Sequence, residues 1–126
     1  MNTDGTAAEQ LDRDDCLRLL STESFGRLAI TTGALPVIVP VRYTIDGDRI
    51  LTTAQPGSRL ALGTGGAVVA FQADDSARNG WPTWTVSVTG KARTIVESAE
   101  LQVAHEVLAR AGWPRTPGGL SRLRPT

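Results

Sequence analysis

The sequence contains one cysteine, one histidine and one lysine among its 126 residues. A single cysteine excludes a disulfide within the chain, and without a CxxC pair or a Cys/His cluster no metal site is expected. No apolar run approaches the roughly 20 residues that span a bilayer. The polar, acidic N-terminus lacks the features of a signal peptide. We therefore expect a cytoplasmic protein with no membrane segment.

Charge of either sign is not in excess, because 13 basic and 13 acidic side chains give a formal net charge of zero. A general nucleic-acid or membrane-surface binder would carry a basic excess, so neither partner is expected. The common catalytic patterns are missing too: the chain has no Ser/His/Asp spacing, no HExxH and no GxGxxG. An enzyme of this kind would depend on a cofactor for its chemistry.

The length favours a single domain with a modest core. We expect residues 1–10 to be disordered and residues 11–126 to form that domain. Residues 11–20 are expected to form a helix with Asp12 as its N-cap. A second helix is expected over residues 98–111, with Ser98 as its N-cap and Gly112 just beyond its end. Its inward-facing positions are expected to be Leu101, Ala104, Leu108 and Ala111.

Apolar residues in alternation predict strands at residues 26–32, 37–44, 49–54, 67–73 and 83–96. The Asp46-Gly47 pair predicts a hairpin turn between the second and third of these strands. The fourth reads AVVAFQA, which predicts burial on both faces, and Gly90 in the fifth predicts a bulge or a bend. Short hairpins with one long bent strand favour an α+β fold, an antiparallel barrel of five or six strands with flanking helices.

The end of the third strand carries the most informative chemistry. Thr52 and Thr53 are followed by a Pro-Gly break and then by Ser58 and Arg59, at the start of a helical segment expected over residues 58–63. Free backbone N–H groups, hydroxyls and a guanidinium would meet there, as a phosphate monoester requires. The simpler alternatives are ordinary strand threonines, which β-branching favours, and a solvated arginine on a helix.

The chain also carries, in this order, GRLAITT, PVIVPVRYT, DGDRILTTAQPGSRL, AVVAFQAD and WTVSVTGKARTIV. Over residues 11–126 this order resembles the split-barrel flavin-binding proteins related to pyridoxamine 5′-phosphate oxidase, especially their short bacterial nitroimidazole-resistance-like members. The resemblance implies a split antiparallel β-barrel of about six strands. It also implies a homodimer with FMN at the interface, or the deazaflavin F420 as in some actinobacterial relatives.

The activity implied by the resemblance is hydride transfer to or from a small substrate by a flavin-dependent oxidoreductase. A non-catalytic flavin-binding carrier or sensor is the alternative. The substrate-phosphate signature of the pyridoxamine phosphate oxidases proper is missing, so pyridoxamine phosphate is not the expected substrate. The substrate itself is not predicted.

The resemblance further implies the residues that would bind the flavin. The phosphate group would contact Thr52, Thr53, Ser58 and Arg59. The ring would lie along the proline-containing strand, at Pro40, Val41, Arg42 and Tyr43. Trp84 and Ser87 match a strand that usually lies near the ring.

Several of these residues also have simpler interpretations. Pro40 cannot donate to a strand ladder, so it would mark only a strand edge. Arg42 would be the polar side of a half-exposed strand, and Trp84 would belong to the core or to a dimer interface. His105, the only histidine, is expected to be a packed or partly exposed helix residue, and Trp113 to cover one end of the barrel.

Overall fold

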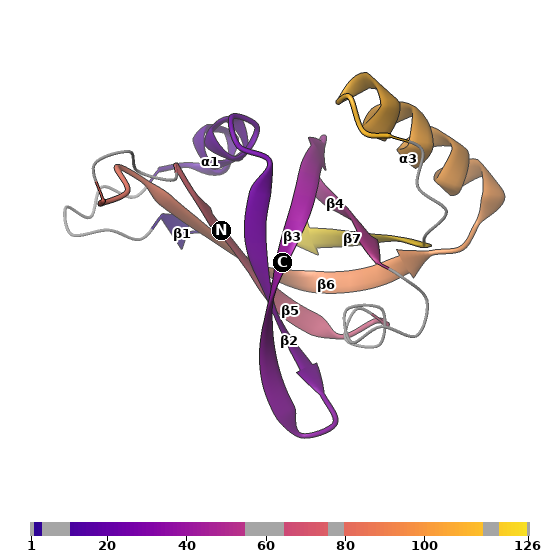
Figure 1. Cartoon of the computed structure of the whole chain (residues 1–126), viewed down its shortest axis with the longest axis horizontal. Helices are drawn as coiled ribbons and strands as arrows, with labels where there is room; N and C mark the ends of the chain where they lie inside the picture. The colour runs from indigo at the N-terminus through magenta and orange to yellow at the C-terminus, as the bar shows by residue number, and fades with distance from the viewer. Residues whose placement is uncertain (1, 4–10, 55–64, 76–79, 115–118, 126) are drawn as a thin grey trace.

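The computed structural model describes residues 2–3, 11–54, 65–75, 80–114 and 119–125 (Figure 1). The expected helix over residues 58–63 lies outside these ranges. The described strands and helices are β1 (Asn2–Thr3), α1 (Arg13–Leu20), β2 (Phe25–Thr32), β3 (Leu35–Asp46), β4 (Arg49–Ala54), β5 (Val68–Asp74), β6 (Thr85–Ile95), α3 (Ser98–Arg110) and β7 (Gly119–Pro125).

Six of the strands form a closed antiparallel barrel. Their order is β6-β5-β2-β3-β4-β7, and β7 also pairs with β6, so that the sheet closes on itself. The expected α+β split barrel of about six strands is confirmed. The two-residue β1 pairs with β6 at Val86 and Ser87. The remaining residues of the segment 1–10 lie outside the described ranges, and their disorder stays a prediction.

The barrel interior is filled by every second residue of each strand, because successive side chains point to opposite faces. Cys16 and Leu20 of α1 join this buried cluster, so α1 packs against the inward-facing side chains. The Asp12 carboxylate accepts a hydrogen bond from the Asp15 backbone N–H at 2.8 Å, which confirms the predicted N-cap. The strand residues of the cluster are Leu28, Ile30, Val41, Tyr43, Ile50, Ala54, Val69, Phe71, Ala73, Val86, Val88, Ala92 and Leu123.

Helix α3 covers a second, smaller cluster on the outside of the barrel. Its Ala104 and Leu108 pack over outward-facing residues of three strands, namely Leu51, Ile95 and Leu120. Gly112 has a φ of 82°, and its N–H bonds to the Ala109 carbonyl while the Trp113 N–H bonds to that of Leu108. This is a Schellman motif, and it confirms the predicted end of the helix.

Two details of α3 differ from the prediction. Glu97, not Ser98, occupies the N-cap position, and its side chain makes no capping hydrogen bond. Ala111 is exposed, because the chain leaves the helix at this residue and no longer follows the helical periodicity.

The strands also differ from the prediction in part. The outer face of β5 is exposed, because α3 covers β4, β7 and the end of β6 instead. The pairing of β5 with β6 continues through Gly90 without an extra residue, so there is no bulge, and the curvature of β6 agrees with the alternative of a bend (Figure 1). Strand β7 was not predicted at all.

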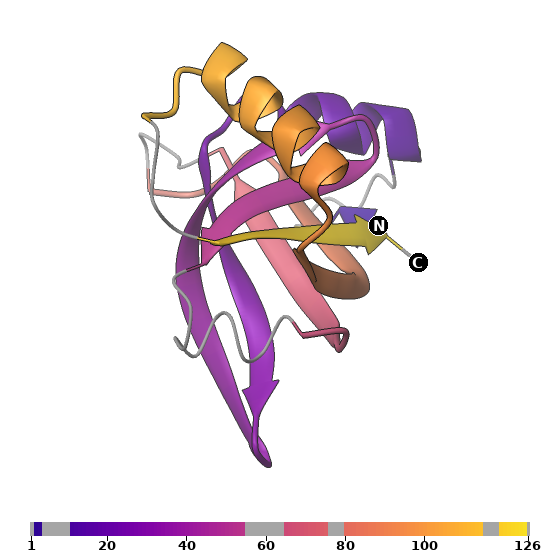
Figure 2. The same cartoon turned by 90° about the vertical axis from the view of Figure 1, so that its right-hand side faces the viewer.

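The β2–β3 hairpin extends away from the barrel on the side opposite the two helices, in both views (Figures 1 and 2). Its exposed apolar side chains include Leu35 and Ile38. In the part of the chain that the structure describes, neither helix is long and apolar enough to cross a membrane.

Candidate functional site

The proline-containing strand divides its predicted ligand residues between two faces. Val41 and Tyr43 point into the barrel and are 6% and 2% exposed, whereas Pro40 and Arg42 face outward. The register of β3 with β4 begins only at Tyr43. In the described chain, residues 35–42 of β3 therefore have a strand partner, β2, on one side only. The prediction that Pro40 lies at a strand edge is confirmed.

Tyr43 has a structural role that the sequence did not reveal. Its hydroxyl donates a hydrogen bond to the Leu20 carbonyl at 2.5 Å, which ties β3 to the end of α1. Its ring meets the ring of Phe71 edge to face, with centroids 4.8 Å apart. Burial, and secondarily the charge of Glu23, raise the pKa of the Tyr43 phenol above its ordinary value. The side chain is therefore part of the core and not of a ligand surface.

Because Tyr43 is the only tyrosine, its ionisation can be followed directly by phenolate absorbance. The fold favours the neutral phenol, so this contribution to stability is complete below the unfolded-state pKa of about 10 and is lost as the pH rises above it. We expect phenolate to appear together with unfolding in an alkaline titration. A phenolate signal with an ordinary pKa in protein that stays folded would contradict the burial.

Tyr43→Phe is the matched variant, because it keeps the ring and removes the hydroxyl. The Leu20 carbonyl retains a bond from the Glu23 N–H at 3.3 Å. We therefore expect a loss of about 1 kcal/mol in the free energy of unfolding at neutral pH. Above the ordinary pKa of tyrosine, the free energy of unfolding of the variant should also fall less steeply with pH than that of the unchanged protein.

Arg42 contacts the end of α3. Its guanidinium lies over the ring of Trp113, 4.6 Å from the ring centroid. The Schellman motif fixes the backbone of Trp113, and the indole packs against the cluster under α3. Trp113 thus joins an outward-facing residue of β3 to the helix. Arg42 is half-buried on the outer face of β3, which agrees with the interpretation as the polar side of a half-exposed strand, and its guanidinium is held against Trp113.

The two threonines of β4 have different surroundings. Thr52 is buried, and its hydroxyl donates to the Arg42 carbonyl at 2.8 Å. Thr53 is half-buried and points to the outer face, like Leu51 two residues earlier. Of the two, only Thr53 can reach a ligand outside the barrel. Ser58 and Arg59 lie outside the described residues.

Trp84 lies just before β6 and Ser87 lies on it, and this strand does not pair with β3. The half-buried Trp84 packs against the main core cluster. Ser87 accepts a hydrogen bond from the Gln72 amide at 3.0 Å. The register places Pro40, Arg27, Gln72 and Ser87 in one row across four strands. With strands about 4.8 Å apart, Ser87 lies roughly 14 Å from Pro40 along the outer face.

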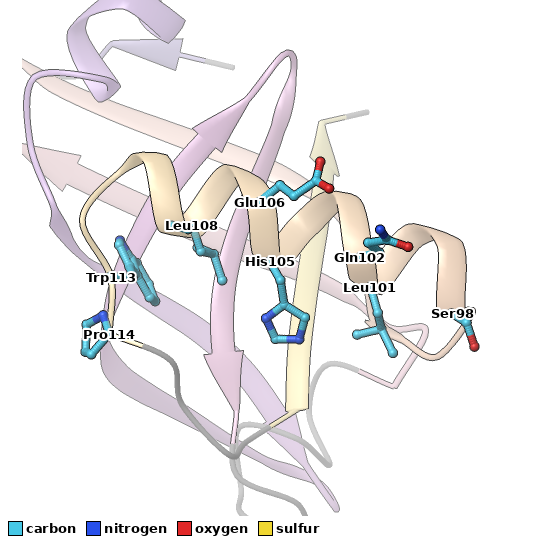
Figure 3. Close-up of a pocket in the computed structure, with 9 residues that line it drawn as sticks. Ser98, Leu101, Gln102, His105, Glu106, Leu108, Trp113 and Pro114 are labelled. Carbon is cyan, nitrogen blue, oxygen red and sulfur yellow. The ribbon is translucent and has the colours of Figure 1, made fainter.

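A groove of about 570 Å³ runs along α3. Leu101, His105 and Trp113 lie on the same side of the helix in Figure 3. Leu108 and Pro114 add to this largely apolar lining, and Gln102 and Glu106 supply polar groups. Sequence reasoning missed the groove, although the spacing of residues 101, 105 and 108 already places them on one helical face.

The N-terminal half of α3 is held to the barrel by charge. The Glu100 carboxylate accepts a hydrogen bond from Arg122 of β7 at 2.9 Å and lies 3.8 Å from a guanidinium nitrogen of Arg49 on β4. The hydrogen bond from Arg122 is the main reason that the pKa of Glu100 lies below its usual value. Asp46 also pairs with Arg49. In the ranges that the structure describes, no three His, Cys, Asp or Glu side chains gather closely enough to hold a metal ion.

Comparison with known proteins gives concordant results. Residues 12–124 match the model of the pyridoxamine 5′-phosphate oxidase family. An uncharacterized protein of Mycobacterium tuberculosis is 31% identical over 97 residues, which make up 73% of this chain and 64% of that protein. The chain thus spans less than two thirds of that relative.

Two solved structures are also similar. The FAD binding protein from Mycobacterium smegmatis is 27% identical, with a TM-score of 0.74, over 92% of this chain and 90% of that one. A putative pyridoxamine 5′-phosphate oxidase from Corynebacterium glutamicum is 21% identical, with a TM-score of 0.76, over 100% of this chain and 89% of that one. At this lower identity, the second match shows the fold alone.

Proposed function

This chain belongs to the pyridoxamine 5′-phosphate oxidase family, and on that premise we propose that it is a flavin-binding oxidoreductase that uses FMN. The observation that carries the proposal is the likeness to the FAD binding protein from M. smegmatis, which extends over nine tenths of both chains. The family match covers the whole barrel and α3. The substrate is a small molecule that the flavin reduces or oxidises.

The open edge of β3 suits the polar rim of a flavin ring. Backbone N–H and C=O groups of residues 35–42 on that edge have no strand partner in the described chain and are available to a ligand. Pro40 has no N–H and cannot compete for such a ligand. The Arg42 carbonyl already accepts a bond from Thr52, so the neighbouring backbone groups are the better candidates.

The side chains nearby would orient the cofactor. Thr53 faces outward one strand away from Arg42, and its hydroxyl would bind the phosphate together with Ser58 and Arg59. The Arg42 guanidinium, held against Trp113, would place a positive charge near the ring. A bound flavin supplies hydride transfer, while these residues supply binding, orientation and charge.

Identification of the cofactor tests the proposal directly. The freshly purified protein is expected to show flavin absorbance, and denaturation should release FMN, which chromatography distinguishes from FAD and riboflavin. Apoprotein should then be titrated with FMN, FAD, riboflavin and F420. If F420 is the one compound that binds, the cofactor is the deazaflavin and not FMN. Failure of all four to bind would leave a barrel with another role.

Arg59→Ala tests the phosphate contact. We expect FMN binding to weaken by about 1.5–3 kcal/mol, the range for a hydrogen bond to a charged group. Ser58→Ala should cost about 1 kcal/mol, as a neutral hydrogen bond does. Riboflavin has no phosphate, so Arg59→Ala should not change its affinity. An equal loss for riboflavin and FMN would mean that Arg59 acts through folding.

We also propose that two copies of the chain form a homodimer with the cofactor at their interface. Large apolar side chains are exposed on the outer face of the sheet, including Phe25 (69%), Ile38 (69%) and Val68 (61%). Large apolar side chains exposed on one sheet face would be covered by a second copy of the chain.

Ile38→Arg tests this assembly. In sedimentation equilibrium at micromolar concentration, we expect a dimer for the unchanged protein and a monomer for Ile38→Arg, because the charge would be buried without a partner. Val103→Arg is the control, since Val103 is also exposed but lies on α3. A monomeric unchanged protein would argue against a shared flavin site.

A further inference from the structure

Four basic side chains lie on the outer face of the seam where β6 and β7 close the barrel. Lys91 stands directly opposite Arg124, and Arg93 stands directly opposite Arg122. Residues opposite one another in an antiparallel pair have Cβ atoms about 4.5–5.5 Å apart, and like charges in such positions repel. We name these four residues the seam cations. Their arrangement destabilises the free protein.

Acidic side chains compensate only part of this charge, and the Glu100 carboxylate, which also attracts Arg124, is the main one. Arg122 is bound by Glu100, and the neighbouring Arg49 is paired with Asp46. Within the described residues, Lys91, Arg93 and Arg124 have no ion-pair partner, and all three are exposed. The whole chain has as many acids as bases, so the surplus at the seam is local.

Two of the seam cations, Arg93 and Arg122, border an open hollow of about 370 Å³ beside the N-terminal half of α3. Its lining is mixed in charge: Arg93, Arg122 and Thr94 come from the strands, and Gly65, Gly66, Val96, Glu97 and Glu100 complete it. The bond to Glu100 holds the Arg122 guanidinium at this wall. A side chain at Gly66 would approach the Arg93 guanidinium to 4.0 Å, so the glycine leaves space beside that group.

We propose that the seam cations bind a diphosphate group. Along each strand the two cations are about 6.6 Å apart, and across the pair about 5 Å, so that a compact multivalent anion can contact several of them together. Arginine offers a planar fork of donors that matches phosphate oxygens. An anion bound there would also remove the repulsion between the opposed cations.

The patch is too limited for an extended polyanion. On β6 it is bounded by Thr89 and by the buried Ile95, and on β7 by the buried Leu120. The diphosphate could belong to a free nucleotide such as ADP or to a dinucleotide cofactor such as FAD. The proposal does not rest on the flavin site at β3 and β4, because it involves different strands and different side chains.

Calorimetric titration of the full chain with pyrophosphate tests the proposal. We expect pyrophosphate to bind about tenfold or more tightly than orthophosphate, and Lys91→Gln and Arg93→Gln each to weaken it by about tenfold, as expected for a lost charge-assisted bond. Arg18→Gln is the control, because Arg18 is an exposed arginine on α1. No binding at low ionic strength, or equal weakening by Arg18→Gln, would overturn the proposal.

Thermal unfolding separates binding from a structural role. Without pyrophosphate, Lys91→Gln and Arg124→Gln should raise the unfolding midpoint, because each removes one member of a repelling pair. Added pyrophosphate should raise the midpoint of the unchanged protein more than that of the variants. If the variants unfold earlier and lose pyrophosphate affinity together, the cations act through the fold and the proposal fails.

The source of the diphosphate is decided by competition. If Lys91→Gln lowers the affinity for FAD but not for FMN, the diphosphate belongs to a dinucleotide. If ADP binds while FMN remains bound, the diphosphate belongs to a separate nucleotide. If Lys91→Gln changes the affinity for neither ADP nor FAD, the proposal is overturned. The proposal is also overturned if a single-stranded oligonucleotide binds more tightly than pyrophosphate and loses this affinity in Lys91→Gln.

Discussion

Phe71→Ala is expected to lower the free energy of unfolding by about 3–5 kcal/mol, the range for deleting a buried aromatic side chain. Phe71 lies in the centre of β5 and is 1% exposed. It meets the Tyr43 ring edge to face, and it fills the space above Gly26, where a Cβ atom would come within 2.5 Å of the phenyl ring. The substitution would therefore leave a cavity bordered by three strands.

Urea unfolding followed by tryptophan fluorescence measures this loss. Val103→Ala on α3 is the control, because Val103 is exposed outside the proposed dimer face and its substitution should change stability by no more than about 0.5 kcal/mol. Phe71→Leu should cost less than Phe71→Ala, since more of the volume is kept. A cost below about 1 kcal/mol for Phe71→Ala would show that the interior can collapse around the missing ring.

Gly90→Ala is expected to destabilise the barrel by about 3 kcal/mol or more, the upper end of the overpacking range. A Cβ atom at Gly90 would lie 2.0 Å from the Arg124 carbonyl oxygen and 2.7 Å from its carbon. These are backbone atoms of β7, so they cannot rotate away as a side chain would. The two strands would have to separate at the pairing that closes the barrel.

Gly119→Ala is the matched control on the partner strand. A Cβ atom there would lie 3.1 Å from the Ala54 carbonyl oxygen, which requires only a small shift. Hydrogen exchange should show faster exchange of the β7 amides in Gly90→Ala than in Gly119→Ala. Equal stability of the two variants would mean that β7 is able to move away without breaking the sheet.

The sequence was sufficient wherever local chemistry decides the structure. Asp12 caps α1, and Gly112 ends α3, because each provides a conformation or a bond that the adjacent backbone needs. The strand at Arg49–Ala54 follows from alternation bounded by the Asp46-Gly47 turn. The order of segments likewise resembled the family to which the chain belongs.

Strand β7 could not be found in this way. Leu120 faces outward under α3, while Leu123 faces into the barrel. Because both faces of β7 carry buried residues, the sequence GLSRLRP lacks the alternation of a half-exposed strand. The opposite error occurred at β5, where an apolar sequence predicted burial on both faces although no described helix covers the outer one.

The tertiary structure decided which residues come together at the candidate sites. The alternation of β4 places Thr52 and Thr53 on opposite faces, but only the position of the barrel shows that Thr53 is the outward one. The contact of Arg42 with Trp113 joins residues 71 positions apart (113 − 42). No local pattern contains such a contact.

The seam cations show the same limit most clearly. The sequence by itself determined the balance of charges, the strand that carries Lys91 and Arg93, the N-cap of α1 and the end of α3. That Lys91 meets Arg124, and Arg93 meets Arg122, depends on the register between β6 and β7. Register between strands distant in the chain is set by how the whole barrel closes around its core, because a shift of one residue would turn every buried side chain outward.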